Sequence, residues 1–384
     1  MSWGMRSRAA IVREVGGAWS VEKFDLDPPR TGEVLVRMAA AGLCHSDVHI
    51  RNGFMAPPGA APKSRPPTIG GHEGSAVVVE VGDGVTGLAP GDHVVTSFVA
   101  VCGHCRWCAS GMEYLCDKGA GVLIPGMPTD GTFRHHTLDG HDLGHTSKIG
   151  AFAEHTVVAA DSLVKIDPAI PLVPAALLSC AVPTGYGSAV NRADVRPGDT
   201  VVVIGVGGIG TAAVQGARIT GATTIVAVDP VAFKRDSSFG FGATHCAASA
   251  AEALDLVRDL TCGVMADVVV VCPSDLTGDD IRAGLTLTRK GGTCVLTGMA
   301  PAGPQPVTLD VQDLVLMNKN VRGTVFGSCN PRSDIPLLAG MYSAGDLMLD
   351  EMITRRYRLD DINDAFDDLL RGELIRGVID FGTA

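Results

Sequence analysis

Four cysteines lie within one short segment, CGHCRWCASGMEYLC, at 102–116. Two, two and seven residues separate them, a spacing that can bring four thiolates to one tetrahedral zinc and leave no position for a substrate. Gly103 and Gly111 allow tight turns around the ion. Unrelated buried cysteines or a redox pair fit less well, because the thiols are so close together and no βαβ pattern flanks them. The segment predicts a structural zinc site at Cys102, Cys105, Cys108 and Cys116.

A second group of metal-ligand types is spread over three segments. Cys44 stands in AAGLCHSDVHI, His72 in IGGHEGSA, and Cys180 in LLSCAVPTGYGSAV. Each of these residues alone is more often a packing residue than a ligand. Together they form a Cys₂His set, which leaves the fourth zinc position open for water or substrate, as catalytic zinc sites do.

The second half of the chain carries a dinucleotide-binding pattern. A β-branched run at 201–204 predicts a buried parallel strand. Gly205, Gly207 and Gly210 then match G-x-G-x-x-G where a helix over 209–220 is expected to begin. A glycine-rich loop without a ligand is the weaker interpretation, because strand, turn, helix and a second strand at 224–228 follow in order.

The residue after that second strand indicates which dinucleotide binds. Asp229 lies nineteen positions past the last glycine of the motif, where a carboxylate can accept a hydrogen bond from a ribose 2′-hydroxyl. The same charge would repel a 2′-phosphate, so the sequence predicts NAD rather than NADP. Lys234 either donates to the same ribose or is an ordinary solvated lysine.

Length and composition exclude several classes of protein. A chain of 384 residues that is 46% hydrophobic, with 48 glycines, favours two domains of α/β type. Its net charge of −11 argues against nucleic acid as a partner. The N-terminus lacks the apolar core of a secretory signal, and no apolar stretch is long enough for a membrane span. Eleven cysteines without a signal therefore predict a reducing cytoplasm.

The chain resembles the zinc-dependent medium-chain alcohol dehydrogenases along nearly its whole length. The resemblance rests on GLCHSD, GGHE, CGHCRWCASGMEYLC, SCAVPTGYGSAV, VVVIGVGGIG and RGELIRGVIDF. Within that family it is most similar to the actinobacterial branch of nicotinoprotein alcohol dehydrogenases, which depend on N,N-dimethyl-4-nitrosoaniline. That similarity rests on VAVDPVAFKR, FGSCNPRSDI and LMLDEMITRRYRLDDIN.

The resemblance implies a role for each site residue. Cys44, His72 and Cys180 would bind the catalytic zinc, Asp47 would hydrogen-bond His72, and Glu73 would neighbour the metal. Ser46 would take the alcohol proton, and His49 would pass it to solvent through a ribose hydroxyl; the alternative for Ser46 is a helix N-cap. The expected cofactor contacts are His45, Thr184, Gly205, Gly207, Gly208, Ile209, Gly210, Asp229, Lys234, Thr297 and Arg376. The expected substrate pocket contains Phe98, Met299 and Val325.

The resemblance also implies the domain plan. A catalytic domain over 1–181 would hold a chaperonin-10-like (GroES-like) β-barrel, and a doubly wound, parallel-sheet Rossmann domain would span 182–324. The chain would then return to the catalytic domain over 325–384. NKNVRGTVFGSC, at 318–329, resembles the family's dimer-forming strand, so a homodimer or homotetramer is expected.

Some features depart from the family pattern. His45 stands where many relatives have an arginine that contacts the pyrophosphate, and Ala76 replaces a glycine. The Pro- and Ala-rich stretch at 50–71 is longer than in many relatives and is expected to reshape the substrate entrance. Four histidines could suggest a third metal site, but an exposed loop is the preferred interpretation; they are His135, His136, His141 and His145.

These observations predict an oxidoreductase with two zinc ions and NAD. It would interconvert an alcohol, primary or aryl, and its aldehyde or ketone by hydride transfer. The NAD(H) would either exchange or stay bound and be regenerated by an external electron acceptor. A thiol-adduct formaldehyde dehydrogenase is the alternative enzyme, although no anion-binding pocket for it can be located in the sequence. A non-enzymatic zinc scaffold is disfavoured by the intact set of ligand and relay residues.

Overall fold

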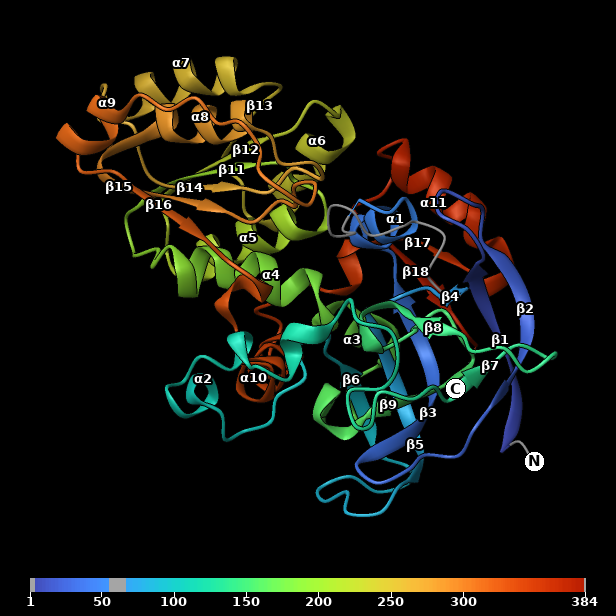
Figure 1. Cartoon of the computed structure of the whole chain (residues 1–384). Coiled ribbons are helices and arrows are strands. Elements are labelled where there is room, and N and C mark those ends of the chain that lie inside the picture. The colour runs from blue at the N-terminus through green and yellow to red at the C-terminus, as the bar shows by residue number, and fades with distance from the viewer. Residues whose placement is uncertain (1–3, 55–66, 383–384) are drawn as a thin grey trace.

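The structure is a computed structural model that describes residues 4–54 and 67–382. Figure 1 shows two lobes, one built on a parallel sheet with helices around it and one rich in β-strands. The long Pro- and Ala-rich stretch expected to shape the substrate entrance falls mostly at 55–66, outside the described residues.

The parallel sheet is made of valine-rich strands buried on both faces. Its order is β13-β12-β11-β14-β15-β16. The strands are β11 (Thr200–Ile204), β12 (Thr224–Val228), β13 (His245–Ala247), β14 (Ala266–Val271), β15 (Thr288–Leu296) and β16 (Asn320–Gly323). Val201 and Val203 pack into one hydrophobic cluster and Val202 into another, because successive side chains of a strand point to opposite faces.

Helices cover both faces of this sheet (Figure 1). Residues of α4 (Ala181–Gly187), α5 (Gly208–Ile219) and α10 (Pro331–Ser343) join the cluster that contains Val201. Residues of α7 (Ala250–Leu260) and α8 (Gly278–Leu287) join the opposite cluster. Helix α6 (Ala232–Phe241) follows β12, and helix α9 (Val311–Leu316) precedes β16. Parallel strands with helices on both faces confirm the α/β fold predicted for this part of the chain.

The β-rich lobe contains two further sheets. One has the order β7-β2-β1-β4-β8, with strands β1 (Met5–Val12), β2 (Ser20–Leu26), β4 (Thr68–Ile69), β7 (His135–His136) and β8 (Gly144–His145). The other has the order β10-β6-β5-β3-β18-β17, with β9 also paired to β3. Its strands are β3 (Glu33–Gly42), β5 (Gly74–Val81), β6 (His93–Thr96), β9 (His155–Ala159), β10 (Leu163–Lys165), β17 (Ile353–Tyr357) and β18 (Arg376–Asp380).

The C-terminal segment returns to the β-rich lobe. Strand β18 pairs antiparallel with β3, and α11 (Ile362–Leu370) packs its apolar face into the core of the same lobe. Three short α-helices also belong to this lobe: α1 (His45–Arg51), α2 (Arg106–Ala109) and α3 (Leu172–Ala175). Because the parallel sheet lies within 200–323, we keep 182–324 as the proposed extent of the cofactor domain.

Three of the four histidines assigned to an exposed loop lie elsewhere, so that prediction was wrong for them. His135 and His145 are buried in β7 and β8, and His136 is half-buried. The rings of His135 and His145 lie 5.1 Å apart, and His135 also packs on Phe24. These strands are too short to produce an alternating hydrophobic pattern, so they could not be predicted from the sequence. Of these four histidines, only His141 is exposed.

Within the described ranges, no single helix is long and apolar enough to cross a membrane. One bent pair of helical segments, Leu172–Ser179 and Ala181–Arg192, reaches that length and composition only when its two parts are counted together.

Candidate metal centres and cofactor cleft

Four buried side chains from three segments converge at the junction of the two lobes. Cys44, His72, Glu73 and Cys180 each offer a ligand atom, and these atoms all lie within 4.8 Å of one another. Cys44 follows β3 in extended conformation, His72 and Glu73 precede β5, and Cys180 precedes α4. Two thiols and one imidazole are a donor set that suits zinc, so the residues present fit the expected metal.

The two thiols of this group lie close enough to interact with each other. The Cys180 thiol donates to Cys44, which is the main reason that the pKa of Cys44 lies well below its usual range. The same hydrogen bond is the main reason that the pKa of Cys180 is raised. Two sulfur atoms held this close in a buried site are arranged as ligands of one cation.

A buried carboxylate orients the histidine of this group. Asp47 Oδ1 lies 3.0 Å from His72 Nδ1 and also accepts from the Gly71 backbone N–H at 3.2 Å. The contact places a proton on Nδ1, so Nε2 keeps the lone pair that a metal needs. Helix α1 begins directly after Cys44 and contains Asp47. The start of this helix therefore provides both the ligand Cys44 and the carboxylate that orients the ligand His72.

Glu73 links this metal site to the cofactor cleft. Its carboxylate contacts the Arg376 guanidinium, and both side chains are almost completely buried. Burial is the main cause that raises the pKa of Glu73, to about 8, against the opposing charge of Arg376. Arg376 also packs on the start of α5, where a Cβ on Gly208 would collide with its side chain. Its buried Nε has no partner among the described residues, so a donor faces the glycine-rich turn.

A cleft of about 370 Å³ runs from the metal ligand Cys44 along the ends of four parallel strands. Its wall includes Gly205 after β11, Asp229 after β12, Cys272 after β14 and Thr297 after β15. Ligands of open α/β sheets bind at this edge. The other expected site residues on the wall are His45, Ser46, His49, Gly207, Gly208, Ile209, Gly210, Lys234, Met299 and Arg376. Thr184 does not line this cleft; it is buried in α4.

The glycine-rich turn has the geometry that a diphosphate requires. Gly205 has φ +86°, and a Cβ on Gly210 would collide with the Gly205 carbonyl. Nothing lies within 4 Å of the position that a Cβ on Gly207 would take, so this side of the turn is open. The turn therefore combines a tight bend, close packing of helix on strand and free space where phosphates bind.

Asp229 is fixed at the edge of the same cleft. One carboxylate oxygen accepts from the Val206 N–H at 3.0 Å and the other from the Val231 N–H at 2.9 Å. The carboxylate is thus held in place at the end of β12, and Asp229 as a whole is 5% exposed. The predicted fit to NAD rests on this orientation.

The two expected relay residues lie one helical turn apart on α1. The Ser46 hydroxyl is 3.5 Å from Cys44 Sγ and donates to Met299 Sδ at 3.4 Å. Cys44, not Ser46, occupies the N-cap position of α1, so the helix-capping alternative for Ser46 does not apply. His49 Nε2 lies 3.1 Å from the Ser274 carbonyl oxygen.

The three expected pocket residues separate in the structure. The Phe98 ring lies 6.0 Å from His72 and 5.4 Å from Phe326, next to the metal site. Met299 lines the cleft beside Ser46. Val325 is 41% exposed and is not among the residues that line the cleft, because it follows the edge strand β16.

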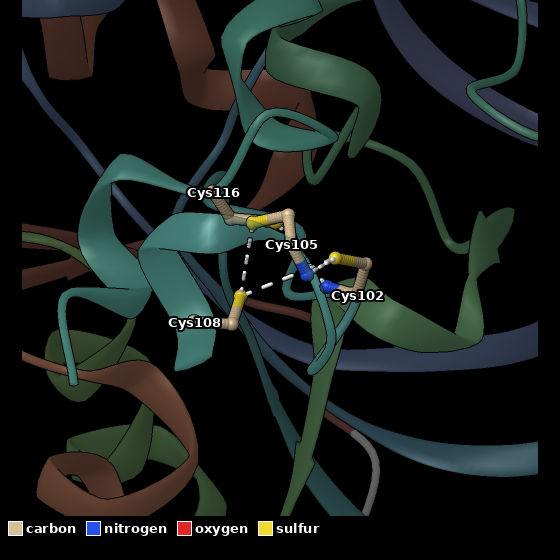
Figure 2. Close-up of side chains that lie close together, drawn as sticks. All are labelled: Cys102, Cys105, Cys108 and Cys116. Carbon is tan, nitrogen blue, oxygen red and sulfur yellow. Dashed lines mark hydrogen bonds between the residues drawn. The ribbon is translucent and has the colours of Figure 1, made fainter. Parts of the chain in front are cut away.

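The four clustered cysteines form a second compact group, shown in Figure 2. Their sulfur atoms all lie within 4.8 Å of one another. Backbone N–H groups point at two of the sulfurs, from Cys102 to Cys116 Sγ and from Cys105 to Cys102 Sγ, each at 3.3 Å. Gly103 and Gly111 have φ of +81° and +76°, as the tight turns required. Four sulfurs with no other donor fit a closed structural zinc site, and the described residues contain no third candidate metal group.

Sequence reasoning did not identify the loop after β14 as part of the site. Ser274 and Asp275 line or border the cleft because the fold brings this loop against α1. Neither residue belongs to a local motif, and each is separated from His49 by more than two hundred positions. Only a long-range signal could have found them.

A metal set beside a dinucleotide cleft defines a metal-dependent dehydrogenase, and known proteins specify the family. Residues 30–168 match the family "Alcohol dehydrogenase GroES-like domain", and residues 208–343 match "Zinc-binding dehydrogenase". The NDMA-dependent alcohol dehydrogenase of Amycolatopsis methanolica is 46% identical over 375 residues, which cover 98% of this chain and 99% of that protein. Alcohol dehydrogenase B of Mycobacterium tuberculosis (strain ATCC 25618 / H37Rv) is 46% identical over 375 residues, with 98% of each chain covered.

A solved structure agrees with these relatives. The alcohol dehydrogenase zinc-binding domain protein from Burkholderia ambifaria superposes with a TM-score of 0.90 at 31% identity, covering 99% of this chain and 100% of that one. The chain belongs to the zinc-dependent medium-chain alcohol dehydrogenase family. It is a zinc-dependent alcohol oxidoreductase of a family that binds zinc and NAD(P). The predicted family, fold class and enzyme class are therefore confirmed.

Proposed function

We propose that this enzyme interconverts primary or aryl alcohols and their aldehydes by hydride transfer to an NAD that stays bound through turnover. The single observation that carries the proposal is the shared cleft. It joins the ligand Cys44 to the glycine-rich turn, Asp229 and Arg376 in one continuous wall. The NDMA dependence of the Amycolatopsis relative, which is 46% identical, supports a bound cofactor and an external electron acceptor.

The residues of the Cys₂His group would hold one zinc, with Asp47 fixing the tautomer of His72. Zinc in such a site supplies a Lewis acid that favours loss of the alcohol proton near neutral pH. Ser46, next to Cys44, is placed to accept that proton, and His49 lies one turn further along α1. Met299 now accepts the Ser46 hydrogen bond, so a bound alcohol must displace its sulfur from this hydroxyl.

Several contacts support NAD as the resident nucleotide. NAD supplies the hydride acceptor, and Asp229 would accept from its ribose and reject a 2′-phosphate. Arg376 would meet the diphosphate with the buried Nε that has no partner. The turn that follows α11 packs on the start of α6, where a Cβ on Gly372 would lie 3.3 Å from Val231. Gly372 and Val231 both line the cleft, and we expect their close approach near Asp229 to slow release of the nucleotide.

We further propose a second zinc at the four clustered cysteines, a homodimer as the assembly and the cytoplasm as the compartment. All eleven cysteines of the chain are unpaired, which supports the reducing compartment. The exposed edge strand β16 supports the assembly.

The decisive experiment measures what the purified, extensively desalted protein contains. We expect close to one NAD(H) per chain after denaturation, and two zinc ions by elemental analysis. We also expect benzyl alcohol to bleach N,N-dimethyl-4-nitrosoaniline without added NAD. The matched control is Cys180→Ser, which should keep the zinc of the four-cysteine site and lose this activity.

Each other outcome has a defined meaning. Protein without nucleotide that oxidises benzyl alcohol only when NAD is added would refute the bound cofactor and leave an ordinary dehydrogenase. Protein with zinc and nucleotide that oxidises no alcohol under either condition would refute the proposed substrate class.

A further inference from the structure

His49 is buried at the contact between the two lobes. Its side chain is 7% exposed, and its ring packs on Phe54 with centroids 4.3 Å apart. On the other side its Nε2 faces the loop after β14, 3.1 Å from the Ser274 carbonyl oxygen and 3.6 Å from Asp275 Oδ1. Little of the ring therefore meets bulk water directly, although the residue also lines the cofactor cleft.

The hydrogen-bond partner of Nε2 determines which ring nitrogen of His49 carries the hydrogen. A carbonyl oxygen can only accept, so Nε2 carries the hydrogen that points at Ser274. In the neutral ring Nδ1 is then the nitrogen without a proton. A proton that reaches His49 is therefore taken at Nδ1, and the proton that leaves must be the one on Nε2.

Asp275 is the group beside Nε2 that reaches water. Its side chain is 64% exposed, against 7% for His49. The loop that holds it is anchored at the active site, because the Leu276 N–H donates to the Met299 carbonyl at 2.7 Å and Asp275 forms a backbone bridge with Met299. The same Met299 accepts from Ser46 through its sulfur, so one short unit positions both relay residues.

No other acid competes with Asp275 for this role among the described neighbours of His49. The other acid on α1 is Asp47, whose carboxylate is held by His72 Nδ1 and the Gly71 N–H. The basic groups near His49 on the same helix are His45, whose pKa is lowered mainly by burial, and Arg51, whose guanidinium lies 5.9 Å from the Phe366 ring. None of these three is a proton acceptor at Nε2.

We propose that Asp275 is the outlet of the proton relay, acting through His49; this rests on the alcohol oxidation proposed above. His49 takes a proton on Nδ1 and becomes an imidazolium. Its Nε2–H bond then breaks, the Asp275 carboxylate gains that proton, and the ring is left neutral as the Nδ1–H tautomer, which must return to Nε2–H before the next proton is taken. Asp275 passes the proton to water at once, because a carboxylic acid is a stronger acid than an imidazolium. The outlet joins residues of both lobes, so it exists only while the lobes are in contact.

The test follows proton release separately from hydride transfer. Full-length enzyme that carries its bound NAD is mixed with benzyl alcohol in weak buffer that contains a pH-indicator dye, and the absorbance of the NADH formed on the enzyme is recorded in parallel. In Asp275→Asn we expect proton release to slow by roughly threefold to tenfold, less than the roughly 10²–10⁴-fold of a group that acts directly in the transition state, and to be restored by a small diffusible buffer base. Asp275→Glu should retain most of the wild-type rate, and Asp279→Asn, which removes a more exposed charge nearby, should not differ from wild type.

A second readout needs no turnover. Nitrogen-15 spectra of histidine-labelled protein, with His49→Gln to assign the signal, should show His49 as the Nε2–H tautomer in the wild type and in Asp275→Asn. The Nδ1–H tautomer would overturn the proposal, and so would proton release in Asp275→Asn that matches the wild type. If the wild type itself oxidises no alcohol while the tautomer is as expected, the proposed function fails instead.

Discussion

Asp229 is the side chain that we propose selects NAD over NADP. Both of its oxygens accept backbone N–H groups, from Val206 and Val231, which hold the negative charge at the end of β12. In Asp229→Asn the charge is gone, and one of those N–H groups faces an amide NH₂ instead of an acceptor. We expect the preference for NAD over NADP to fall by about tenfold to a hundredfold, or about 1.4–2.8 kcal/mol.

The measurement is the ratio of kcat/KM for the two nucleotides, or their ratio in the denatured protein if the nucleotide does not exchange. Asp255→Asn removes a carboxylate that is 77% exposed on α7 and serves as the control. An unchanged ratio in Asp229→Asn would mean that other contacts exclude the 2′-phosphate.

At the residue scale, local motifs could be predicted from sequence and distant partners could not. Residue type and spacing were enough to predict the Cys₂His set, the four cysteines and the glycine-rich turn. The structure brings the residues of each set together. The pairing of Glu73 with Arg376 spans 303 positions, and that of His49 with Asp275 spans both lobes. Such contacts follow from the fold alone. Val325, an exposed apolar residue beside an edge strand, lies outside the residues that line the cleft, which its sequence context did not indicate.

The segment around the four cysteines is hydrogen-bonded to the start of α10. Asn330 at the start of α10 accepts from the Glu113 N–H at 2.8 Å and donates to the Gly111 carbonyl at 3.0 Å. We expect Cys105→Ser to reduce zinc from two ions per chain to one and to lower Tm by roughly 5 °C or more, because a structural zinc contributes directly to folding.

Elemental analysis and a thermal melt test this prediction. Cys262→Ser, which removes an exposed thiol in the turn after α7, is the matched control and should leave both values unchanged. Two zinc ions per chain in Cys105→Ser would contradict a four-thiolate site.

Strands β7 and β8 carry a pH-sensitive pair of histidines. Burial is the main cause that lowers the pKa of His145 to about 3, and burial also places the pKa of His135 well below its usual range. Between about pH 6.5 and pH 3 the unfolded chain therefore binds protons that the folded chain does not. Stability falls as pH drops through this window, by about 1.4 kcal/mol per pH unit for each such histidine.

His145→Phe should reduce this acid sensitivity. Neither ring nitrogen of His145 has a partner among the described residues, and a space of about 40 Å³ beside it leaves room for the larger ring. From pH 7 to pH 5 we expect the variant to lose about 2 kcal/mol less stability than the wild type. Thermal melts at both pH values test this, with the exposed His141→Gln as control. Equal acid sensitivity in His145→Phe and wild type would contradict the buried neutral state.

At the element scale, long buried strands can be predicted from the sequence, and very short strands cannot. The valine runs of β11, β12 and β14 predict a parallel sheet because both faces of these strands are buried by helices. Strands β7 and β8 contain two residues each, fewer than any periodic pattern needs. Their neighbours in the sheet, not their own sequence, make them strands.

At the scale of the whole molecule, the parallel sheet ends in an edge that a single chain leaves uncovered. In the described part of the chain β16 pairs only with β15. Large apolar side chains are exposed on α9, on β16 and just after it: Val311, Val315, Leu316, Val321 and Val325. An unprotected edge strand beside exposed apolar surface is a site for pairing with another chain. A second copy fits best, because edge-to-edge pairing about a twofold axis covers the same patch on both chains.

This surface therefore predicts a homodimer through β16, and it can be tested without touching the active site. We expect size-exclusion chromatography with light scattering to give a dimer for the wild type and a monomer for the double variant Val315→Asp, Leu316→Asp, because four carboxylates would be buried against each other in the dimer. Leu337→Asp, on α10 and 55% exposed, introduces the same kind of charge elsewhere and should remain a dimer. A dimer that survives the double variant would place the interface on another face. A monomeric wild type would mean that the edge of β16 is covered in some other way, and Val325 would then stay exposed in solution.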